Sequence, residues 1–127
     1  KIKNSLSNNG VASMQIITID KKKAIDYQNN PDFIQQYIFP GGVLPSKYQL
    51  KQITELIGLQ LIEYKSFQNS YAKTLNLWNK KFQSSWDQIS EQGFSSRFRK
   101  MWEYYFCYCE AGFISGSTDV SQFILKK

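Results

Sequence analysis

Histidine is absent from this 127-residue sequence, and cysteine occurs only at Cys107 and Cys109. Without histidine, the chain has no imidazole metal ligand and no Ser-His or Cys-His nucleophile pair. The two cysteines lie two residues apart in a helical pattern, so they point to different faces and suit neither a disulfide nor a shared metal. We therefore expect free thiols and a cytoplasmic protein.

Long apolar runs and phosphate-binding loops are missing as well. No stretch reaches the roughly 18–20 apolar residues that would span a bilayer, and no signal peptide is visible. Gly41-Gly42 follows a helical pattern and a proline rather than a strand, so it is not the glycine-rich turn of a nucleotide site. Walker loops, zinc spacings and nucleophile elbows are absent, which leaves no catalytic motif to read directly from the residues.

Positive charge and aromatic rings are what the sequence does contain. The net charge is +6, and 42% of the residues are hydrophobic, enough for one domain with a packed core. A basic surface suits nucleic acid, anionic lipid or acidic partners, or serves solubility alone. Because the lysines are scattered and no RNA-binding motif lies among them, we expect no nucleic-acid partner.

Three short segments rich in β-branched residues predict strands: Val11–Ile19, Leu59–Phe67 and Ser117–Leu125. The first is apolar along most of its length and is expected to be buried on both faces. Residues 1–10 predict the last turns of a helix that ends in a glycine cap at Gly10.

The segment YIFPGGVLPS, residues 37–46, combines large apolar side chains with chain-breaking residues. Asn30-Pro31-Asp32 predicts the start of a helix that Pro40 ends. Ser46 and Gln49 form an S-x-x-Q capping box, which predicts a second helix closed by Gly58. The side chains expected to face inward from this second helix are Leu50, Ile53, Leu56 and Ile57.

Two longer apolar stripes predict helices that end near Gly93 and at Gly112, the second capped by Ser95. The first stripe consists of Tyr71, Leu75, Trp78, Phe82, Trp86 and Ile89. The second consists of Phe98, Met101, Trp102, Tyr105 and Cys109. Strands separated by pairs of helices indicate an α/β fold, and no change in composition marks a second domain within residues 1–127.

Several segments of the chain resemble the cyclopropane-fatty-acyl-phospholipid synthase family, which includes the mycolic-acid cyclopropane synthases. They are QIITI (Gln15–Ile19), FIQQYIFPGGVLPS (Phe33–Ser46), YAKTLNLW (Tyr71–Trp78), MWEYYFCYCEAGF (Met101–Phe113) and DVSQFILKK (Asp119–Lys127). The resemblance implies the C-terminal portion of a Rossmann-like class I methyltransferase sheet. That portion would have three strands in a mixed sheet, the last running antiparallel between its neighbours, with about four to five helices.

The reaction implied by the resemblance is transfer of a methyl from S-adenosylmethionine to the cis double bond of a phospholipid acyl chain. The resulting carbocation loses a proton as a cyclopropane ring closes, with bicarbonate as the implied base. Such a cation needs an apolar, aromatic-lined pocket. The family's cofactor loop and its acidic and cysteine active-site residues lie upstream of this chain, so we expect the isolated chain to be inactive.

Three residues match the family's anion site. Tyr71 matches the tyrosine whose hydroxyl holds the bicarbonate, although spacing alone favours reading it as the first residue of a core stripe. Gln15 and Ile17 match a His-x-Ile pair and face the same side of a strand. Glutamine can donate to an anion but cannot titrate, which puts strict cyclopropanation in doubt. Gln15 is equally well read as a buried polar residue satisfied by the backbone.

Residues 31–57 correspond to a lid over the acyl channel, or else to ordinary core packing. The substrate-binding candidates in it are Phe33, Tyr37, Ile38, Phe39, Gly41, Gly42 and Leu44. We expect Trp78, Trp102 and Tyr105 to be core residues. Ile114 stands where many relatives carry arginine, and the lost charge either weakens a head-group contact or is neutral.

The expected partners are phospholipid acyl chains at the inner face of the membrane, where the protein would be peripheral. Two other readings stay open. One is a non-catalytic lipid- or protein-binding module that forms a homodimer through an exposed sheet edge. The other is a related methyltransferase that acts on a small molecule.

Overall fold

The structure, a computed structural model, describes all 127 residues. They form two compact units. The sheet unit contains Lys1–Phe67 and Ser117–Lys127, and the helical unit contains Gln68–Gly116. No helix in the chain is both long enough and apolar enough to cross a membrane.

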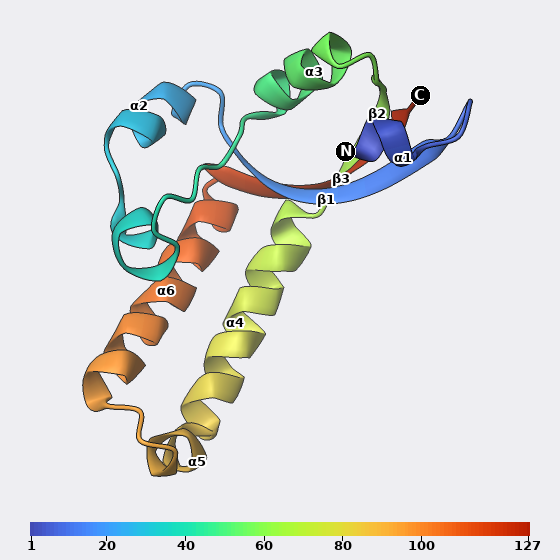
Figure 1. Ribbon diagram of the computed structural model, residues 1–127. Helices are drawn as coiled ribbons and strands as arrows, with labels where there is room; N and C mark the ends of the chain where they lie inside the picture. The colour runs from blue at the N-terminus through green and yellow to red at the C-terminus, as the bar shows by residue number, and fades with distance from the viewer. The chain divides into compact units, whose positions relative to one another are not determined.

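The sheet unit is built on three strands: β1 (Val11–Ile19), β2 (Gln60–Ser66) and β3 (Thr118–Lys126). Their order is β1-β3-β2, and both pairings are antiparallel (Figure 1). The last strand therefore runs against both of its neighbours, which confirms the predicted α/β class and the predicted direction of the third strand. The strand bounds agree with the sequence prediction to within a residue.

Burial of β1 differs from the prediction. Only the end of the strand is buried, at Thr18 and Ile19, whereas Val11, Ser13 and Gln15 are exposed. The expectation of a strand buried on both faces is therefore wrong for its first half. A β-branched composition favours a strand but does not say which of its residues are covered.

Four short helical segments complete the sheet unit: α1 (Ile2–Ser5), α2 (Ala24–Asn29), the π-helix η1 (Ile34–Ile38) and α3 (Lys47–Leu56). The whole chain has six α-helices, more than the four to five expected. Three of them, α1, α2 and α5, are too short to leave a clear periodic pattern in the sequence. Gly10 does not cap α1, which ends at Ser5 with Leu6 as its C-cap. Asn9 instead has the left-handed backbone conformation, in a turn where Gly10 N–H donates to the Ser7 carbonyl at 2.9 Å.

α3 begins with the predicted capping box. Ser46 Oγ accepts from Gln49 N–H at 3.2 Å, and Gln49 Oε1 accepts from Ser46 N–H at 2.8 Å. Gly58, at φ 72°, closes the helix as expected. The predicted inward face is wrong, however: Thr54 is the buried residue of α3, whereas Leu56 is 85% exposed. Ile53 and Ile57 are exposed too, and Leu50 is half-buried.

An ion pair attaches the start of α3 to the sheet. Lys47 Nζ lies 2.6 Å from Asp119 Oδ2 and 4.6 Å from the centre of the Tyr64 ring. Asp119 also accepts from Ser66 Oγ at 2.8 Å and from Ser121 Oγ at 2.9 Å. α3 therefore lies over the sheet face that carries Asp119.

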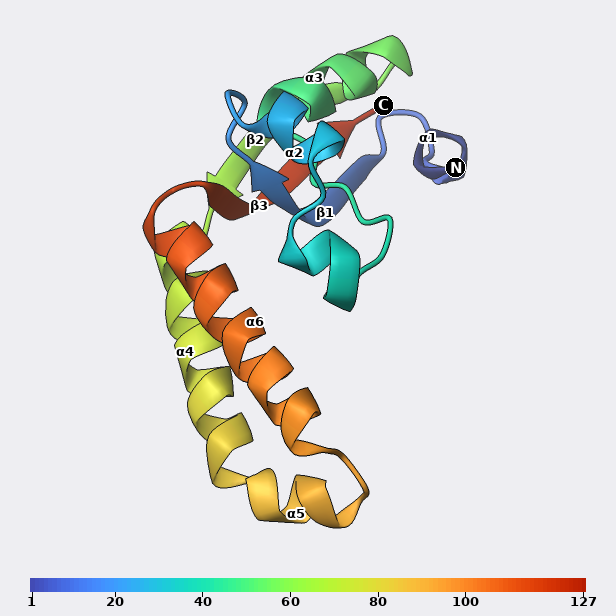
Figure 2. The ribbon, with the colours of Figure 1, turned by 90° about the vertical axis from the view of Figure 1, so that its left-hand side faces the viewer.

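The helical unit is a hairpin of α4 (Gln68–Ser84) and α6 (Ser96–Ile114), joined through α5 (Trp86–Glu91). Figure 2 shows α4 and α6 side by side, with α5 at their far end. The single helix expected up to Gly93 is broken at Ser85, whose N–H donates to both the Lys81 and the Phe82 carbonyls. Gly93, at φ 92°, lies in the turn that follows α5.

Ser95 caps α6 as predicted, with its Oγ accepting from Phe98 N–H at 3.3 Å. The predicted end at Gly112 is wrong, because the helix continues to Ile114. Gly116, at φ 74°, supplies the left-handed turn instead.

The hairpin core contains Ala72 and Leu75 from α4 and Phe106 and Phe113 from α6. The predicted second stripe missed both phenylalanines. Its own members are only half-buried. The expectation that Trp78 is a core residue is also wrong, since 48% of it is exposed.

Candidate functional site

Tyr71 lies in the first turn of α4, against aromatic rings. Its ring centre is 4.8 Å from that of Phe113 and 6.0 Å from that of Trp78. Gln68 fixes this end of the hairpin, because its Nε2 donates to the Phe113 carbonyl at 2.7 Å. The start of α4 and the end of α6 together hold the Tyr71 ring half-buried.

The Tyr71 hydroxyl stays protonated over a wide pH range. Burial raises the pKa of this phenol above its ordinary value, and the nearby Cys109 thiol raises it further. A protonated phenol donates one hydrogen bond, which suits an anionic or carbonyl oxygen. The site therefore offers a neutral donor surrounded by rings.

Tyr105 and Cys109 lie near Tyr71, and the sequence did not assign either of them to the site. Burial raises the pKa of Tyr105 to about 12, with contributions from Cys109 and Tyr71 and a hydrogen bond to Cys109. Tyr105 and Cys109 are four residues apart on α6, so they share a face. That spacing was visible in the sequence, but it gave no sign that α4 would bring Tyr71 to the same place.

Gln15 and Ile17 lie on one face of β1, as predicted from their spacing. Gln15 is opposite Gln122 of β3, and Gln122 is in turn opposite Lys65 of β2. Gln15 is exposed and its side chain makes no hydrogen bond, which contradicts the reading of a buried, backbone-satisfied glutamine. Its amide is free to bind a ligand.

The three residues predicted for the anion site belong to different units. Tyr71 is in the helical unit, and Gln15 and Ile17 are in the sheet unit. Within the sheet unit, β1 fixes the relative positions of Gln15 and Ile17. A common site for all three remains a prediction.

The lid segment is a folded loop with an apolar surface. η1 closes with Phe39 N–H donating to the Ile34 carbonyl at 2.8 Å, and Pro40 ends it as predicted. Gln35 Nε2 then donates to the Gly42 carbonyl at 3.0 Å, and Gly41 has a φ of 77°.

Part of the apolar surface of this loop faces outward. The Phe33 and Tyr37 ring centres lie 5.6 Å apart, and Tyr37 is 60% exposed. Phe39 is exposed as well, whereas Ile38 and Leu44 are half-buried. Ordinary core packing therefore does not account for Tyr37 and Phe39.

A groove of about 400 Å³ separates the end of this loop from α3. Its apolar walls come from Val43, Pro45, Leu50 and Ile53, and its polar lining from Gln28, Gln49 and Gln52. An open channel with apolar walls and amide groups suits the uncharged part of a lipid.

The order and directions of the three strands indicate the class of protein. A strand that runs antiparallel between its neighbours, in an α/β arrangement, is shared with class I S-adenosylmethionine-dependent methyltransferases. The chain belongs to the mycolic acid cyclopropane synthetase family, whose model matches residues 1–123.

Two relatives show how far the similarity extends. Tuberculostearic acid methyltransferase UfaA1 of Mycobacterium tuberculosis is 39% identical over 117 residues, which are 91% of this chain and 27% of that enzyme. Cyclopropane-fatty-acyl-phospholipid synthase of Escherichia coli is 32% identical over 110 residues, 87% of this chain and 28% of the relative. The chain thus spans less than a third of the length of these relatives.

The fold similarity covers the same stretch. Mycolic acid cyclopropane synthase CmaA1, solved with SAH and CTAB, superposes with a TM-score of 0.86 and 31% identity. The match covers 98% of this chain and 47% of that one.

The glycine-rich turn that binds a nucleotide cofactor in α/β folds does not follow β1 in this chain. After β1 the chain turns at Asp20, whose carboxylate accepts from Lys22 N–H at 2.7 Å, and no glycine-rich turn follows the strand. We therefore assign no cofactor contact to these residues.

Proposed function

We propose that this chain is part of an enzyme that transfers a methyl or methylene from S-adenosylmethionine to the cis double bond of a phospholipid acyl chain. The family supports the class of reaction. The observation that carries the assignment of a site is Tyr71, a protonated phenol held among aromatic rings. The chain alone is expected to be inactive, because it lacks the cofactor loop.

The residues of this chain would act on the substrate and on an anion. Tyr71 would donate its hydroxyl hydrogen to a bicarbonate oxygen, and Gln15 would donate an amide hydrogen. The rings of Phe113 and Trp78 would exclude water and stabilise positive charge on the alkylated chain. The loop from Phe33 to Leu44 would cover the acyl chain.

A second candidate function is methyl transfer without ring closure. It is favoured by Gln15, which cannot accept a proton and remain part of a charged relay as a histidine could. The 39% identity to a tuberculostearic acid methyltransferase also supports methyl transfer without ring closure. The small-molecule alternative gains no support from the exposed apolar loop.

Membrane location is a further part of the proposal. A phospholipid substrate requires the enzyme to work peripherally, at the inner face of the membrane. The exposed Tyr37 and Phe39 are suited to that surface. A non-catalytic module that dimerises through the sheet edge remains the alternative.

A chimera tests the proposed reaction. Residues 1–127 would replace the matching segment of the Escherichia coli synthase, and the product would be incubated with S-adenosylmethionine and unsaturated phospholipid vesicles. We expect mass spectrometry to show a gain of one CH₂ per modified chain. Tyr71→Phe should reduce the rate about a hundredfold, because one hydrogen bond to the anion is lost. Tyr104→Phe, an exposed tyrosine of the same unit, should not change it.

Four measurements test the proposed function and its alternatives. A folded chimera that binds S-adenosylmethionine but leaves the lipid unchanged would refute the proposed function. Full activity of Tyr71→Phe would refute the role of Tyr71. NMR of the product separates a cyclopropane ring from a methyl-branched alkene, and Gln15→His should increase the ring fraction. The isolated 127-residue chain should show no binding of S-adenosylmethionine by calorimetry.

A further inference from the structure

The helical unit also has a surface groove, on the side of α4 that faces away from Tyr71. A groove of about 640 Å³ runs between α4 and α6. At about 3.6 residues per turn, its α4 residues Asn69, Lys73 and Asn76 project roughly opposite to Tyr71. The groove is therefore separate from the site proposed for the reaction, and its function need not depend on that reaction.

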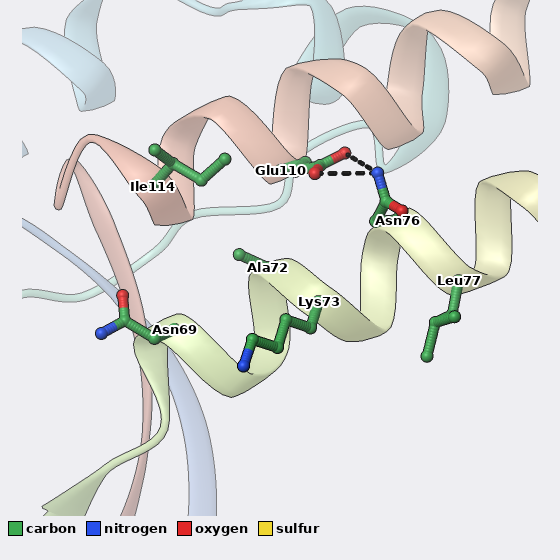
Figure 3. A pocket seen from close by; sticks show the side chains of 7 residues that line it. All are labelled: Asn69, Ala72, Lys73, Asn76, Leu77, Glu110 and Ile114. Atoms are coloured by element: carbon green, nitrogen blue, oxygen red, sulfur yellow. Dashed lines mark hydrogen bonds between the residues drawn. The ribbon is translucent and has the colours of Figure 1, made fainter.

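Opposite charges line this groove without pairing. Lys73 lies on α4 and Glu110 on α6, and the two ion pairs of the structure, Lys47–Asp119 and Lys51–Glu55, do not involve them. Figure 3 shows the Lys73 ammonium toward the Asn69 end and Glu110 across the groove. An ammonium and a carboxylate held apart in one groove complement a ligand that itself carries an anion and a cation.

The position of Glu110 is fixed by α4. Asn76 Nδ2 donates to both carboxylate oxygens, at 3.1 and 3.3 Å (Figure 3). A carboxylate accepts about four hydrogen bonds, so Glu110 keeps acceptor capacity for a ligand ammonium. Asn69 places a second amide near Lys73, where an anionic oxygen would bind.

Two aliphatic side chains flank these polar groups. Leu77 is 64% exposed and Ile114 is 66% exposed, one on each helix. Exposed aliphatic residues beside charged ones suit an amphiphile more than a free ion.

We propose that this groove binds a phosphoethanolamine group, either free or as the head group of a phospholipid. Lys73 and Asn69 would bind the phosphate oxygens, because an ammonium and an amide N–H both donate to anions. Glu110 would accept from the ligand ammonium. Leu77 and Ile114 would contact the methylene groups or the glycerol backbone.

Calorimetry with soluble phosphoethanolamine on the 127-residue chain tests the chemistry. We expect saturable binding, weakened at least tenfold in Lys73→Gln and in Glu110→Gln, which keeps an acceptor for Asn76. Lys80→Gln removes the same charge from α4 outside the groove and should bind normally, as should Tyr71→Phe. Ethanolamine and glycerol phosphate, each with one half of the zwitterion, should bind at least tenfold more weakly.

Vesicle co-sedimentation identifies the source of the group. Phosphatidylcholine vesicles containing phosphatidylethanolamine should retain the chain more than vesicles containing phosphatidylglycerol if the lipid head group is the ligand. Binding of the soluble compound alone, with the same variant pattern, would support a free ligand. The proposal is wrong if phosphoethanolamine binding does not saturate, or if Lys80→Gln weakens that binding as much as Lys73→Gln does. Circular dichroism of each variant checks that the hairpin is intact.

Discussion

Asp119 is an almost buried carboxylate that lies in the middle strand of the sheet. Burial alone would raise its pKa. Hydrogen bonds from Lys47, Ser66 and Ser121, together with the charge of Lys47, outweigh burial and lower the pKa below its ordinary value of 3.8. The ionised form is therefore favoured in the folded state, and it links α3 to β2 and β3.

This shift gives the sheet unit a defined acid sensitivity. Because the folded pKa is depressed, the stabilisation is present above the ordinary value of 3.8 and is lost as the pH falls through the folded pKa. At neutral pH, Asp119→Asn should lower the free energy of unfolding by about 2 kcal/mol, since charge-assisted hydrogen bonds are lost. Urea unfolding followed at several pH values measures both effects.

Glu103→Gln is the matched control for this prediction, because Glu103 is an exposed carboxylate. It should leave the free energy of unfolding nearly unchanged. Asp119→Asn should also be less acid-sensitive than the unmodified chain between neutral pH and pH values below 3.8. If both variants show the same loss between neutral and acidic pH, the network around Asp119 does not stabilise the sheet.

At the scale of elements, the end of α6 depends on one backbone conformation. Gly116 has a φ of 74°, and a Cβ there would lie 3.6 Å from Gln68 Nε2, an ordinary contact. Gly116→Ala should therefore destabilise the chain through the backbone alone, by about 1 kcal/mol. Chemical denaturation measures this, and Gly116→Asn should cost much less because asparagine tolerates the left-handed region. Equal effects of the two substitutions would show that side-chain packing, and not the left-handed backbone conformation, causes the loss of stability.

The elements that local signals define were predictable from the sequence. The Ser46 capping box and the cap at Ser95 involve neighbours within three residues, so both occur as expected. The end of α6 was not predictable, because Gly112 and Gly116 are both plausible caps and the packing of the hairpin selects the second. The exposed face of α3 was not predictable either, since periodicity shows which side chains share a face but not what covers it.

The candidate site was predictable only where one element carries it. Gln15 and Ile17 share a face of β1 because of their spacing alone. The surroundings of Tyr71 depend on Phe113 and Cys109, which are about forty residues away along the chain and reach it only through the hairpin. The groove of Lys73 and Glu110 has the same origin and left no motif in the sequence.

At the scale of the whole molecule, the two units contain ionisable groups whose pKa values are shifted in opposite directions. Asp119 is in the sheet unit, whereas Tyr71 and Tyr105, whose pKa values are raised, are in the helical unit. All three tryptophans, Trp78, Trp86 and Trp102, are also in the helical unit. Tryptophan emission therefore reports on the hairpin, while far-ultraviolet circular dichroism reports on both units.

Alkali should destabilise the helical unit before the sheet unit. The pKa of Tyr105 is raised from 10.0 to about 12, so the neutral phenol is favoured in the folded state. Its stabilisation is complete below about pH 10 and is lost as the pH rises through 12. The urea midpoint followed by tryptophan emission should therefore fall over this range, and Tyr105→Phe should reduce the fall. In acid the order should reverse, because the loss of Asp119 ionisation weakens the sheet unit while the tyrosines stay neutral. Coincident midpoints by both probes at both pH extremes would contradict the prediction, because they would mean that the two units unfold in one cooperative step.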